Sequence, residues 1–231
     1  MTADQQEPEV SAWEPDEEDI AFFRVYGPWE PLTPRQMREL MDGFPHPWWL
    51  VGGHSIEAFT GVRRHHEDLD LSLFVDAVPD LGKQLGERFH LWSNDGGTLR
   101  IIDEKRPEPL HPLAQIWVRE HALAPWLVDI VPSPAVDGRW QSKRDEEHVA
   151  DLDEVTWVHA DGVRYQNPEI SLLFKASQNR PKDRIDLANT WPLLAPEKKQ
   201  WLRKAVARLY PENPWNRALA SDDAICWPED A

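Results

Sequence analysis

Hydrophobic positions recur at every second residue over residues 68–75, which is the period of a β-strand with one buried face. The apolar face carries Leu69, Leu71, Leu73 and Val75. The opposite face carries Asp68, Asp70 and Ser72. The pattern therefore predicts a strand that packs its leucines on a core and presents two neighbouring carboxylates on its other side.

A second strand is predicted directly upstream, over the apolar run 48–51. It ends in Gly52-Gly53, a dipeptide suited to a turn where the backbone approaches another group closely. Residues 54–59 then have helical spacing, and Gly61 is placed to end that helix. A helix that opens behind these glycines points its first N–H groups at the turn, where they favour phosphate binding.

Capping residues and periodic apolar positions place the remaining elements. Helices are predicted over residues 34–41, 79–89 and 196–210, and from Pro168 onward. Strands are predicted over residues 90–93 and 98–102, joined by a hairpin turn at residues 94–97, and over residues 127–131. Residues 137–165 are expected to form a loop and a hairpin, and the tail beyond Pro214 is expected to be loosely attached.

The neighbouring carboxylates of Asp68 and Asp70 require a partner. Two like charges about 4 Å apart repel by roughly 4 kcal/mol at the effective dielectric of a protein surface. Solvent, a shared proton or a cation can relieve this repulsion. Mg²⁺ prefers oxygen ligands and is usually held by one or two carboxylates together with substrate phosphates and water. The pair is either the solvated face of an edge strand or a metal–nucleotide site, and the upstream glycines favour the second interpretation.

The order of these features resembles the signature of the nucleotidyltransferase superfamily, in particular the small antibiotic nucleotidyltransferases that act on aminoglycosides and lincosamides. That signature is an apolar strand, a Gly-Gly or Gly-Ser turn, and an Asp-x-Asp motif one helix later. In this chain Gly52-Gly53 is followed by Arg64-x-His66-x-Asp68-Leu69-Asp70. The resemblance implies an α/β fold of the α+β kind, with a mixed sheet flanked by helices and a helical C-terminal subdomain.

A second match lies in residues 167–187. In the similar enzymes, a Pro-Glu-x-x-Leu-Leu-x-Lys helix followed by Lys-Asp-x-x-Asp begins the helical domain that closes over the site. The matching residues are Pro168, Glu169, Leu172, Leu173, Lys175, Lys182, Asp183 and Asp186. Lys175 has two interpretations: it contacts nucleotide phosphate as a point charge, or it neutralises Asp183 or Asp186 across the helix pair.

Asp129 lies in the middle of the apolar segment 127–131, where an ionised group is costly unless it is paired or bound to a metal. The similar families place a third carboxylate on a strand beside the Asp-x-Asp motif, and Asp129 is the candidate for it. The alternative is a structural carboxylate paired with an arginine such as Arg119. Asp103 is a weaker candidate because it ends its strand.

The resemblance implies transfer of a nucleoside monophosphate from ATP, or another nucleoside triphosphate, to a hydroxyl. It implies that Asp68 and Asp70 hold Mg²⁺, that the Gly52-Gly53 turn with Ser55 binds the phosphate tail, and that Asp129 is a second-metal ligand or the general base. Arg64 is a further candidate phosphate contact, and His66 is expected to brace the end of the strand. Arg139, Lys143 and Arg144 either touch phosphates or form a solvated basic patch.

Charge and length narrow the partner and the domain organisation. The 231 residues carry 41 acids against 25 bases, a net charge of −16. Residues 1–30 contribute nine acids and the single base Arg24, so the remainder still carries −8. An acidic body argues against nucleic acid and suits a small cationic acceptor with a hydroxyl. We expect a flexible acidic arm over 1–30, tethered by Phe22-Phe23, a catalytic domain over 31–166 and a helical subdomain over 167–231.

Several other classes of protein and site are excluded. The single cysteine, Cys226, cannot form an intramolecular disulfide or a Cys-rich zinc site. The sequence contains no Walker motif, no G-x-G-x-x-G and no zinc-type histidine spacing. It has no apolar run long enough for a membrane span and no signal peptide, so a cytoplasmic protein is expected. The thirteen tryptophans are interpreted as packing material rather than a ligand cage.

Two alternatives to a drug-modifying enzyme follow from the same residues. One is a non-catalytic nucleotidyltransferase-like protein that binds a partner, such as one half of a toxin–antitoxin pair. The other is an enzyme that modifies a protein or a tRNA end. Magnesium-dependent ATP binding separates an enzyme from a partner-binding protein, and the intact acidic motif favours the enzyme.

Overall fold

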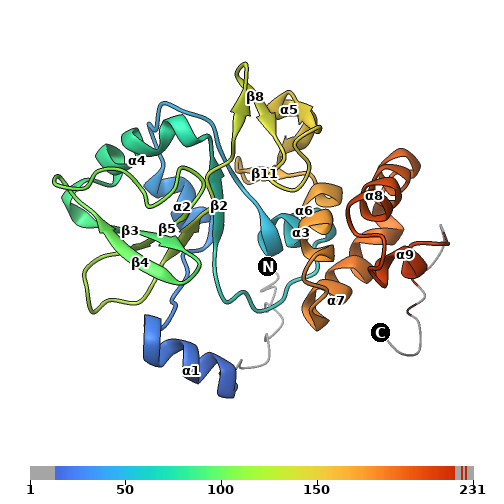
Figure 1. Ribbon diagram of the computed structural model, residues 1–231, viewed down its shortest axis with the longest axis horizontal. Coiled ribbons are helices and arrows are strands. Elements are labelled where there is room, and N and C mark those ends of the chain that lie inside the picture. Colours follow the sequence, from blue (N-terminus) through green and yellow to red (C-terminus); the bar gives the residue numbers. More distant parts are fainter. Residues whose placement is uncertain (1–13, 222–224, 226, 228–231) are drawn as a thin grey trace, which may run out of the picture.

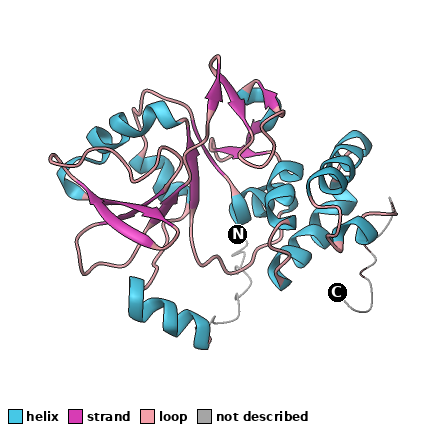
Figure 2. Cartoon of the chain, in the orientation of Figure 1, coloured by secondary structure: helices cyan, strands magenta, loops and turns pink. Residues whose placement is uncertain are grey.

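The computed structural model describes residues 14–221, 225 and 227, and within them the chain folds around one mixed β-sheet (Figure 1). The sheet has eight strands in the order β10-β11-β1-β2-β6-β5-β3-β4. Helices flank this sheet, and the C-terminal helices gather beside one end of it (Figure 2). The predicted fold class, a mixed sheet flanked by helices and followed by a helical C-terminal region, is confirmed.

The strands of the main sheet are β1 Trp48–Leu50, β2 Asp70–Leu73, β3 His90–Asp95, β4 Thr98–Ile102, β5 Gln115–Arg119, β6 Val128–Ile130, β10 Thr156–Val158 and β11 Arg164–Gln166. The pairs β1–β11 and β2–β6 are parallel, and the other pairs are antiparallel. A separate three-stranded sheet consists of β7 Ala135–Val136, β8 Arg139–Gln141 and β9 Val149–Ala150. Both predicted hairpins, β3–β4 and β10–β11, are present.

The α-helices are α1 Glu17–Tyr26, α2 Pro34–Leu40, α3 Gly52–Thr60, α4 Val78–Leu85, α5 Leu152–Val155, α6 Pro168–Ala176, α7 Pro181–Thr190, α8 Pro196–Leu209 and α9 Trp215–Ala218. Short 3₁₀ turns cover Val75–Ala77, Gly86–Arg88 and Trp191–Leu193. Helices α2 and α6 begin where a cap was predicted, behind Thr33 and Asn167. The Thr33 hydroxyl accepts from the Gln36 N–H, whereas the Asn167 side chain makes no capping bond. None of the described helices is long and apolar enough to cross a membrane.

The leucines of β2 anchor the sheet in the main core. Leu69, Leu71 and Leu73 are fully buried and pack with α2, α4 and the neighbouring strands. The predicted alternation is correct up to Leu73, but Val75 leaves the strand and begins a 3₁₀ turn. The period-two pattern therefore identified the buried face and overestimated the length of the strand by two residues at its C-terminal end.

The C-terminal helices have an apolar cluster of their own. Its fully buried members include Leu172, Leu187, Trp191 and Leu202. Ile56 of α3 also packs in this cluster. The helix that follows the Gly-Gly turn is therefore packed between the sheet and the C-terminal helices. The domain boundaries predicted at residues 31–166 and 167–231 remain an expectation.

Two segments are more ordered than the sequence indicated. Residues 17–26 of the expected acidic arm form helix α1, because the Asp16 carboxylate accepts from the Glu18 and Asp19 N–H groups and caps the helix. The tail beyond Pro214 includes α9, whose Trp215 is fully buried and donates to Asn179 Oδ1 at 2.9 Å. The first thirteen residues of the expected arm, and Cys226, lie outside the described residues.

Candidate active site

Gly52 lies directly against the carboxylate of Asp70. It is the first residue of α3 and has a φ of +64°, a conformation that side chains disfavour. A Cβ at this position would overlap Asp70 Oδ2. The Val51 N–H also donates to the Asp70 carbonyl at 3.0 Å, which fixes the turn against the first residue of β2. Only glycine at position 52 allows the start of α3 to approach the carboxylate this closely.

Asp70 and Asp129 are register partners on the parallel strands β2 and β6. Asp68 lies just ahead of β2 and lines the same cavity as both. Burial and the neighbouring Asp68 charge raise the pKa of Asp70 to about 7. Burial also raises the pKa of Asp129 well above its usual range, reinforced by the charges of Asp70 and Asp68 and partly offset by the Trp117 indole. The structure therefore brings the three predicted carboxylates together.

Asp129 has one oxygen bonded and one oxygen free. Its side chain is 5% exposed, and Oδ2 accepts from Gln115 Nε2 at 2.5 Å. Oδ1 is buried without a hydrogen-bond partner among the described residues. A buried carboxylate oxygen without a donor is costly, which is typical of a functional position.

Arg119 is not the structural partner of Asp129. Arg119 forms no ion pair with Asp129; its guanidinium instead lies over the rings of Trp126 and Trp92, at 4.1 and 4.6 Å from their centroids. Asp103, the weaker candidate for the third carboxylate, pairs with Arg106 at the end of β4. Its pKa is lowered because hydrogen bonds from Arg106 outweigh its partial burial.

The carboxylates of Asp68, Asp70 and Asp129 suit a cation site that is completed by other ligands, and they do not form a complete coordination shell by themselves. In the part of the chain that the structure describes, no group of three or more His, Cys, Asp or Glu side chains is arranged to hold a metal ion. The donors are nevertheless all hard oxygens, and Asp129 Oδ1 is unused. Mg²⁺ commonly takes only one or two carboxylates and completes its shell with phosphates and water. Asp68 and Asp70 are the residues that suit this arrangement.

A first cavity, of about 330 Å³, opens over these carboxylates. Its positive side is formed by Lys143, Arg144, Lys175 and Arg180. Hydroxyl and amide side chains contribute the rest of the polar wall, namely Ser72, Ser133, Gln166 and Ser171. The volume lies within the range of small-ligand sites, and carboxylates opposite cations match a triphosphate with its counter-cation.

Lys143 lines the first cavity, although the sequence did not distinguish this position from a solvated basic patch. Its side chain is half-buried in the first cavity, and burial lowers its pKa to about 8, an effect that the nearby Asp129 charge opposes. Of the three basic residues considered together, Arg139 and Arg144 are exposed, and Arg139 pairs at the surface with Asp151 at 2.8 Å. Arg144 lines the cavity, with its guanidinium over the Phe174 ring.

Lys175 adopts the structural one of its two predicted roles. Its Nζ lies 2.8 Å from Asp186 Oδ2 and 3.3 Å from Asp183 Oδ1, and all three side chains are buried. Arg180 also bonds Asp183, through Nε at 2.9 Å. Lys175 reaches the wall of the first cavity, but two carboxylates already match its charge.

Arg64 is likewise committed to a structural contact. Its Nε and Nη2 each donate to an Asp186 carboxylate oxygen at 3.0 Å, and Nη1 donates to the His65 carbonyl. A guanidinium held in this bidentate way is not directed at a phosphate, which corrects the expected phosphate contact. Asp186 thus connects α7 to the loop before β2 and to α6.

His66 lies against α3, and its expected role in bracing the strand end stays a prediction. Its Nε2 lies 2.7 Å from Glu57 Oε2, and its ring stacks on His54 at 3.9 Å. Burial, followed by the charge of His66, lowers the pKa of His54 to about 3, which keeps that ring neutral. A Cβ on Gly53 would collide with Arg64 Nη2 and with the His66 ring, so Gly53 permits this packing rather than lining the first cavity.

Ser55 does not reach the first cavity. Its buried hydroxyl donates to the Gly52 carbonyl at 2.9 Å and lies 2.7 Å from Ser171 Oγ. Ser171 lines the cavity instead, and it donates to Gln166 Oε1 at 2.9 Å. The expected role of Ser55 in phosphate binding is therefore replaced by a bracing role between the glycine turn and α6.

The sequence interpretation did not single out Gln115, Ser171 or Arg180, although each lines the first cavity. Ser171 and Arg180 lie in the C-terminal segment that resembles the known enzymes, so their position there was the available signal. Gln115 had no such signal, since the register that sets β5 beside β6 is fixed only by the folded sheet.

Comparison with solved structures identifies the fold. The solution structure of the antibiotic-resistance factor ANT(2'')-Ia matches with a TM-score of 0.50 at 18% identity, over 84% of this chain and 95% of that chain. This likeness shows that the chain has the fold of that protein. The resemblance to small antibiotic nucleotidyltransferases that the sequence indicated is confirmed at the level of the fold.

Two further structures have slightly lower scores. Lincomycin-bound LnuA, a lincosamide antibiotic adenylyltransferase, has a TM-score of 0.48 at 19% identity, over 69% of this chain and 97% of that one. ANT(2'')-Ia in complex with adenylyl-2''-tobramycin has 0.49 at 16% identity, over 77% and 99%. No family model matches the chain, and no curated protein does.

Proposed function

We propose that the protein transfers a nucleoside monophosphate from ATP, or another nucleoside triphosphate, to a hydroxyl of a small cationic acceptor. The observation that carries the proposal is the first cavity, which is lined by Asp68, Asp70 and Asp129 together with basic side chains that include Lys143 and Arg180. The cavity lies behind a glycine turn on the fold of an antibiotic-resistance factor. Fold alone does not specify function, so the site residues carry the argument.

The nucleotide has a natural orientation in this cavity. The start of α3 at Gly52 lines it and presents helix N–H groups, which favour anionic phosphates. Lys143, Arg144 and Arg180 also line the cavity and supply positive charge. Asp68 and Asp70 would hold Mg²⁺, which when bound neutralises the phosphate charge. The chain's own contribution is then to position the triphosphate and to orient the acceptor.

Asp129 is suited to remove the proton of the attacking hydroxyl. In the proposed step the hydroxyl oxygen bonds to the α-phosphorus and its proton passes to Asp129 Oδ1. The bond between the α-phosphorus and the bridging oxygen breaks, and pyrophosphate leaves. A raised pKa suits a general base that works near neutral pH, and the Gln115 bond fixes the carboxylate orientation.

The acceptor is expected to be cationic because the body of the chain is acidic even without residues 1–30. A negative surface raises the local concentration of a cation and loses this effect over a Debye length of about 8 Å at physiological ionic strength. Turnover should therefore fall as salt concentration rises. Turnover that does not change with salt, or a preference for RNA as the acceptor, would oppose this part of the proposal.

The direct test is a mass-spectrometric search for a nucleotidyl adduct across a panel of hydroxylated amines, including cationic antibiotics, with ATP and Mg²⁺. Matched reactions without Mg²⁺, and reactions with Asp68→Asn, serve as controls. Magnesium-dependent ATP binding, measured in parallel by calorimetry, is expected for the wild type and weakened for the variant. A chain that binds no ATP under these conditions would instead fit a partner-binding protein.

A further inference from the structure

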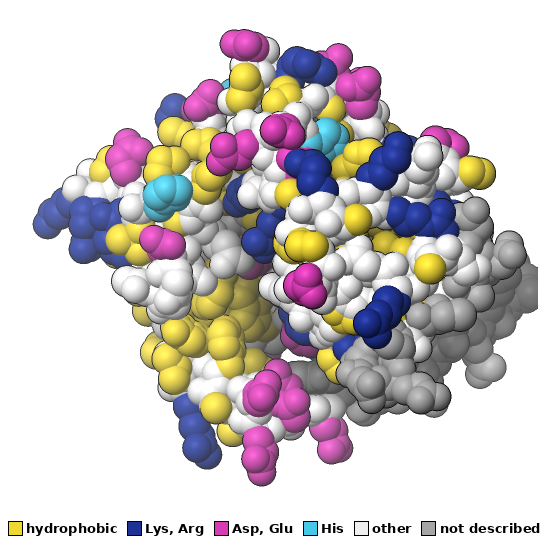
Figure 3. All heavy atoms as spheres, turned by 45° about the vertical axis from the view of Figure 1, so that its right-hand side comes forward, with side chains coloured by type: hydrophobic (Ala, Val, Ile, Leu, Met, Phe, Trp, Pro, Cys, Tyr) yellow, Lys and Arg dark blue, Asp and Glu magenta, His cyan; other side chains and the backbone are white. Residues whose placement is uncertain are grey.

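A second cavity, of about 430 Å³, lies on the other side of the same carboxylates. Asp68, Asp129 and Gln115 line both cavities, so the two spaces meet at the proposed catalytic group. Aromatic side chains form much of its wall, namely Phe22, Phe23, Trp29 and Trp117. In the space-filling view, hydrophobic side chains gather in a hollow above the acidic side chains at the lower edge of the molecule (Figure 3).

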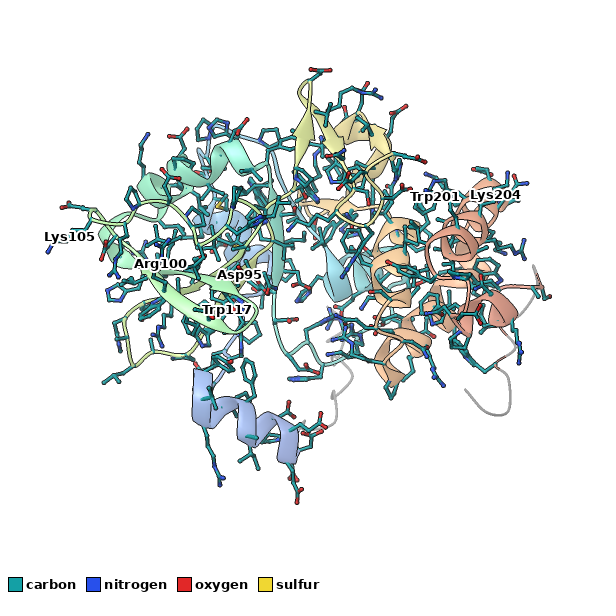
Figure 4. All side chains as sticks on the ribbon, viewed as in Figure 1. Asp95, Arg100, Lys105, Trp117, Trp201 and Lys204 are labelled. Carbon is teal, nitrogen blue, oxygen red and sulfur yellow. The ribbon has the colours of Figure 1, made fainter. Side chains whose placement is uncertain are left out.

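Helix α1 creates this second cavity without closing it. No residue of α1 is fully buried, although Phe22 and Tyr26 lie at 6.0 and 5.9 Å from the Trp117 ring. The helix is fastened at its C-terminal end, where Trp126 Nε1 donates to the Tyr26 carbonyl at 2.7 Å. Trp117 lies on the side of the sheet that faces α1 (Figure 4). Phe22 and Phe23 of α1 therefore line the second cavity, while Phe22 and Tyr26 also contact the Trp117 ring.

The two cavities differ in charge. Carboxylates, lysines and arginines together line the first, whereas the described residues that line the second include carboxylates and the histidines His65 and His66 but no Lys or Arg. Glu18 and Asp19 in the first turn of α1 contribute acidic groups at its edge. Glu67 is already paired with Lys182 at 2.8 Å. The net character of the second cavity is therefore apolar and aromatic with a negative edge.

Asp129 supplies an independent observation that this space receives a ligand. Its Oδ1 is buried without a hydrogen-bond partner among the described residues, and the side chain lines the second cavity. A hydroxyl that enters from this side can donate to that oxygen, while a nucleotide occupies the first cavity. Cations are attracted to aromatic faces as well as to carboxylates, and the second cavity offers both.

We propose that the second cavity is the acceptor site, that α1 determines its specificity, and that it selects a cation bearing an aromatic or apolar ring over a ring-free polycation. The assignment as an acceptor site rests on the proposed transferase function. Binding of a ring-bearing cation, however, can be measured without nucleotide and without turnover. Failure of the cavity assignment and failure of the proposed function are therefore distinguishable.

The binding test uses four simple probes with the full chain in ligand-observed NMR titrations. Phenylethanolamine carries a ring, an ammonium and a hydroxyl, ethanolamine lacks the ring, and benzyl alcohol lacks the ammonium. Spermine carries more positive charge and no ring. We expect phenylethanolamine to bind tighter than each of the other three, by about 3- to 10-fold, the size expected when a cation–π or aromatic contact is lost. Tighter binding of spermine would overturn the proposal.

Variants of α1 locate the binding. Phe22→Ala removes a lining ring and should weaken phenylethanolamine binding by about 3- to 10-fold. Val25→Ala, on the same helix at a position 71% exposed, should leave it unchanged. Glu18→Gln should weaken it about 2- to 5-fold, the range for an exposed charge pair. Glu17→Gln makes the same charge change one residue earlier, outside the cavity lining, and should have no effect.

The outcomes separate the two claims. Binding that depends on Phe22 and Glu18, together with adduct formation at the probe hydroxyl, supports both. If binding depends on Phe22 and Glu18 but no acceptor forms an adduct, the proposed selectivity of the cavity is supported and the transferase function is contradicted. Adduct formation on acceptors whose affinity is unchanged by Phe22→Ala and Glu18→Gln would show that the second cavity is not the acceptor site. The transferase function would still be supported.

Discussion

Asp70 and Asp129 are register partners on the adjacent parallel strands β2 and β6, so their carboxylates lie side by side on one face of the sheet. Adjacent strands lie about 4.8 Å apart, so two ionised groups at this spacing repel strongly when partly shielded from water. The pKa of each group is raised above its usual value, and burial is the larger cause in both. The protein therefore carries an electrostatic penalty at the place where a cation would relieve it.

This penalty predicts that removing one charge stabilises the metal-free protein at alkaline pH. The folded-state pKa of Asp70 is raised to about 7, so the folded protein binds a proton that the unfolded chain releases. The stability that this proton provides is complete only below the unfolded-state pKa of about 3.9, decreases as the pH rises above that value, and is lost above about pH 7. We expect Asp70→Asn to raise the melting temperature at pH 8, to raise it by much less at pH 5, and to leave it nearly unchanged at pH 3.

Each kcal/mol gained should raise the melting temperature by roughly 2–4 °C in a chain of this size. Asp103→Asn is the matched control, because the pKa of Asp103 is lowered by its hydrogen bonds from Arg106, and its loss should not stabilise the protein at pH 8. Adding Mg²⁺ at pH 8 should raise the wild-type melting temperature more than that of Asp70→Asn. Equal melting temperatures of wild type and Asp70→Asn at pH 8 in EDTA would contradict this electrostatic account.

Alanine substitutions at Gly52 and Gly61 separate two effects: the close approach of α3 to Asp70, and backbone strain at a positive φ. Both glycines have positive φ, +64° and +70°, and both lie at ends of α3. Alanine at either position should cost about 1–3 kcal/mol of folding stability through strain. Only Gly52→Ala also places a Cβ on Asp70 Oδ2, whereas Gly61→Ala meets open space.

Calorimetry with ATP and Mg²⁺ on both folded variants distinguishes the two effects. Gly61→Ala should bind with wild-type affinity, and Gly52→Ala should bind at least about 10-fold more weakly because Asp70 is displaced. A tenfold change corresponds to only about 1.4 kcal/mol, well below the energy of a lost carboxylate–cation contact. Equal affinities would show that the Gly52 contact does not support nucleotide binding.

Much of the fold could be predicted because its signals are local. The period of residues 68–75 identified the buried leucines, and the glycine turn identified the start of α3. The carboxylates could be grouped only through the resemblance to known enzymes, since the register of Asp70 with Asp129 depends on strands distant in sequence. The sequence interpretation did not include helix α1, because it relied on the acidity of residues 1–30, although Asp16 and its capping box were visible.

Functional roles assigned to cations were the least predictable part. A sequence shows that Arg64 and Lys175 are positively charged, but it does not show with which carboxylate each forms an ion pair. In the structure Asp186 binds both, so their charges hold α7 against α6 and against the loop before β2 rather than contacting a phosphate. Lys143 shows the reverse case, a residue that resembled a surface lysine and lines the first cavity.

The structural role of Lys175 predicts a stability defect. Lys175→Met removes a cation between Asp183 and Asp186 and leaves two buried carboxylates less well compensated. Breaking a buried ion pair costs about 3–5 kcal/mol, and the remaining bonds from Arg64 and Arg180 should keep the loss at or below the lower end. Thermal or urea unfolding should reveal a clearly less stable protein.

Lys182→Met provides the comparison. Lys182 pairs with Glu67 at the surface, and such pairs contribute at most about 1 kcal/mol. If Lys175→Met unfolded like Lys182→Met and instead lost only ATP affinity, Lys175 would be a phosphate contact and not the centre of a structural network.

Asp129→Asn tests the account most directly. The substitution keeps the shape of the side chain and can keep the contact with Gln115, but it removes the group proposed to take the hydroxyl proton. The rate of nucleotidyl transfer on the folded variant is the measurement. It should fall by at least about 100-fold, the usual loss when a general base is removed. ATP binding and the melting temperature should stay near or above those of the wild type, and a folded Asp129→Asn protein with the wild-type transfer rate would contradict the three-carboxylate site.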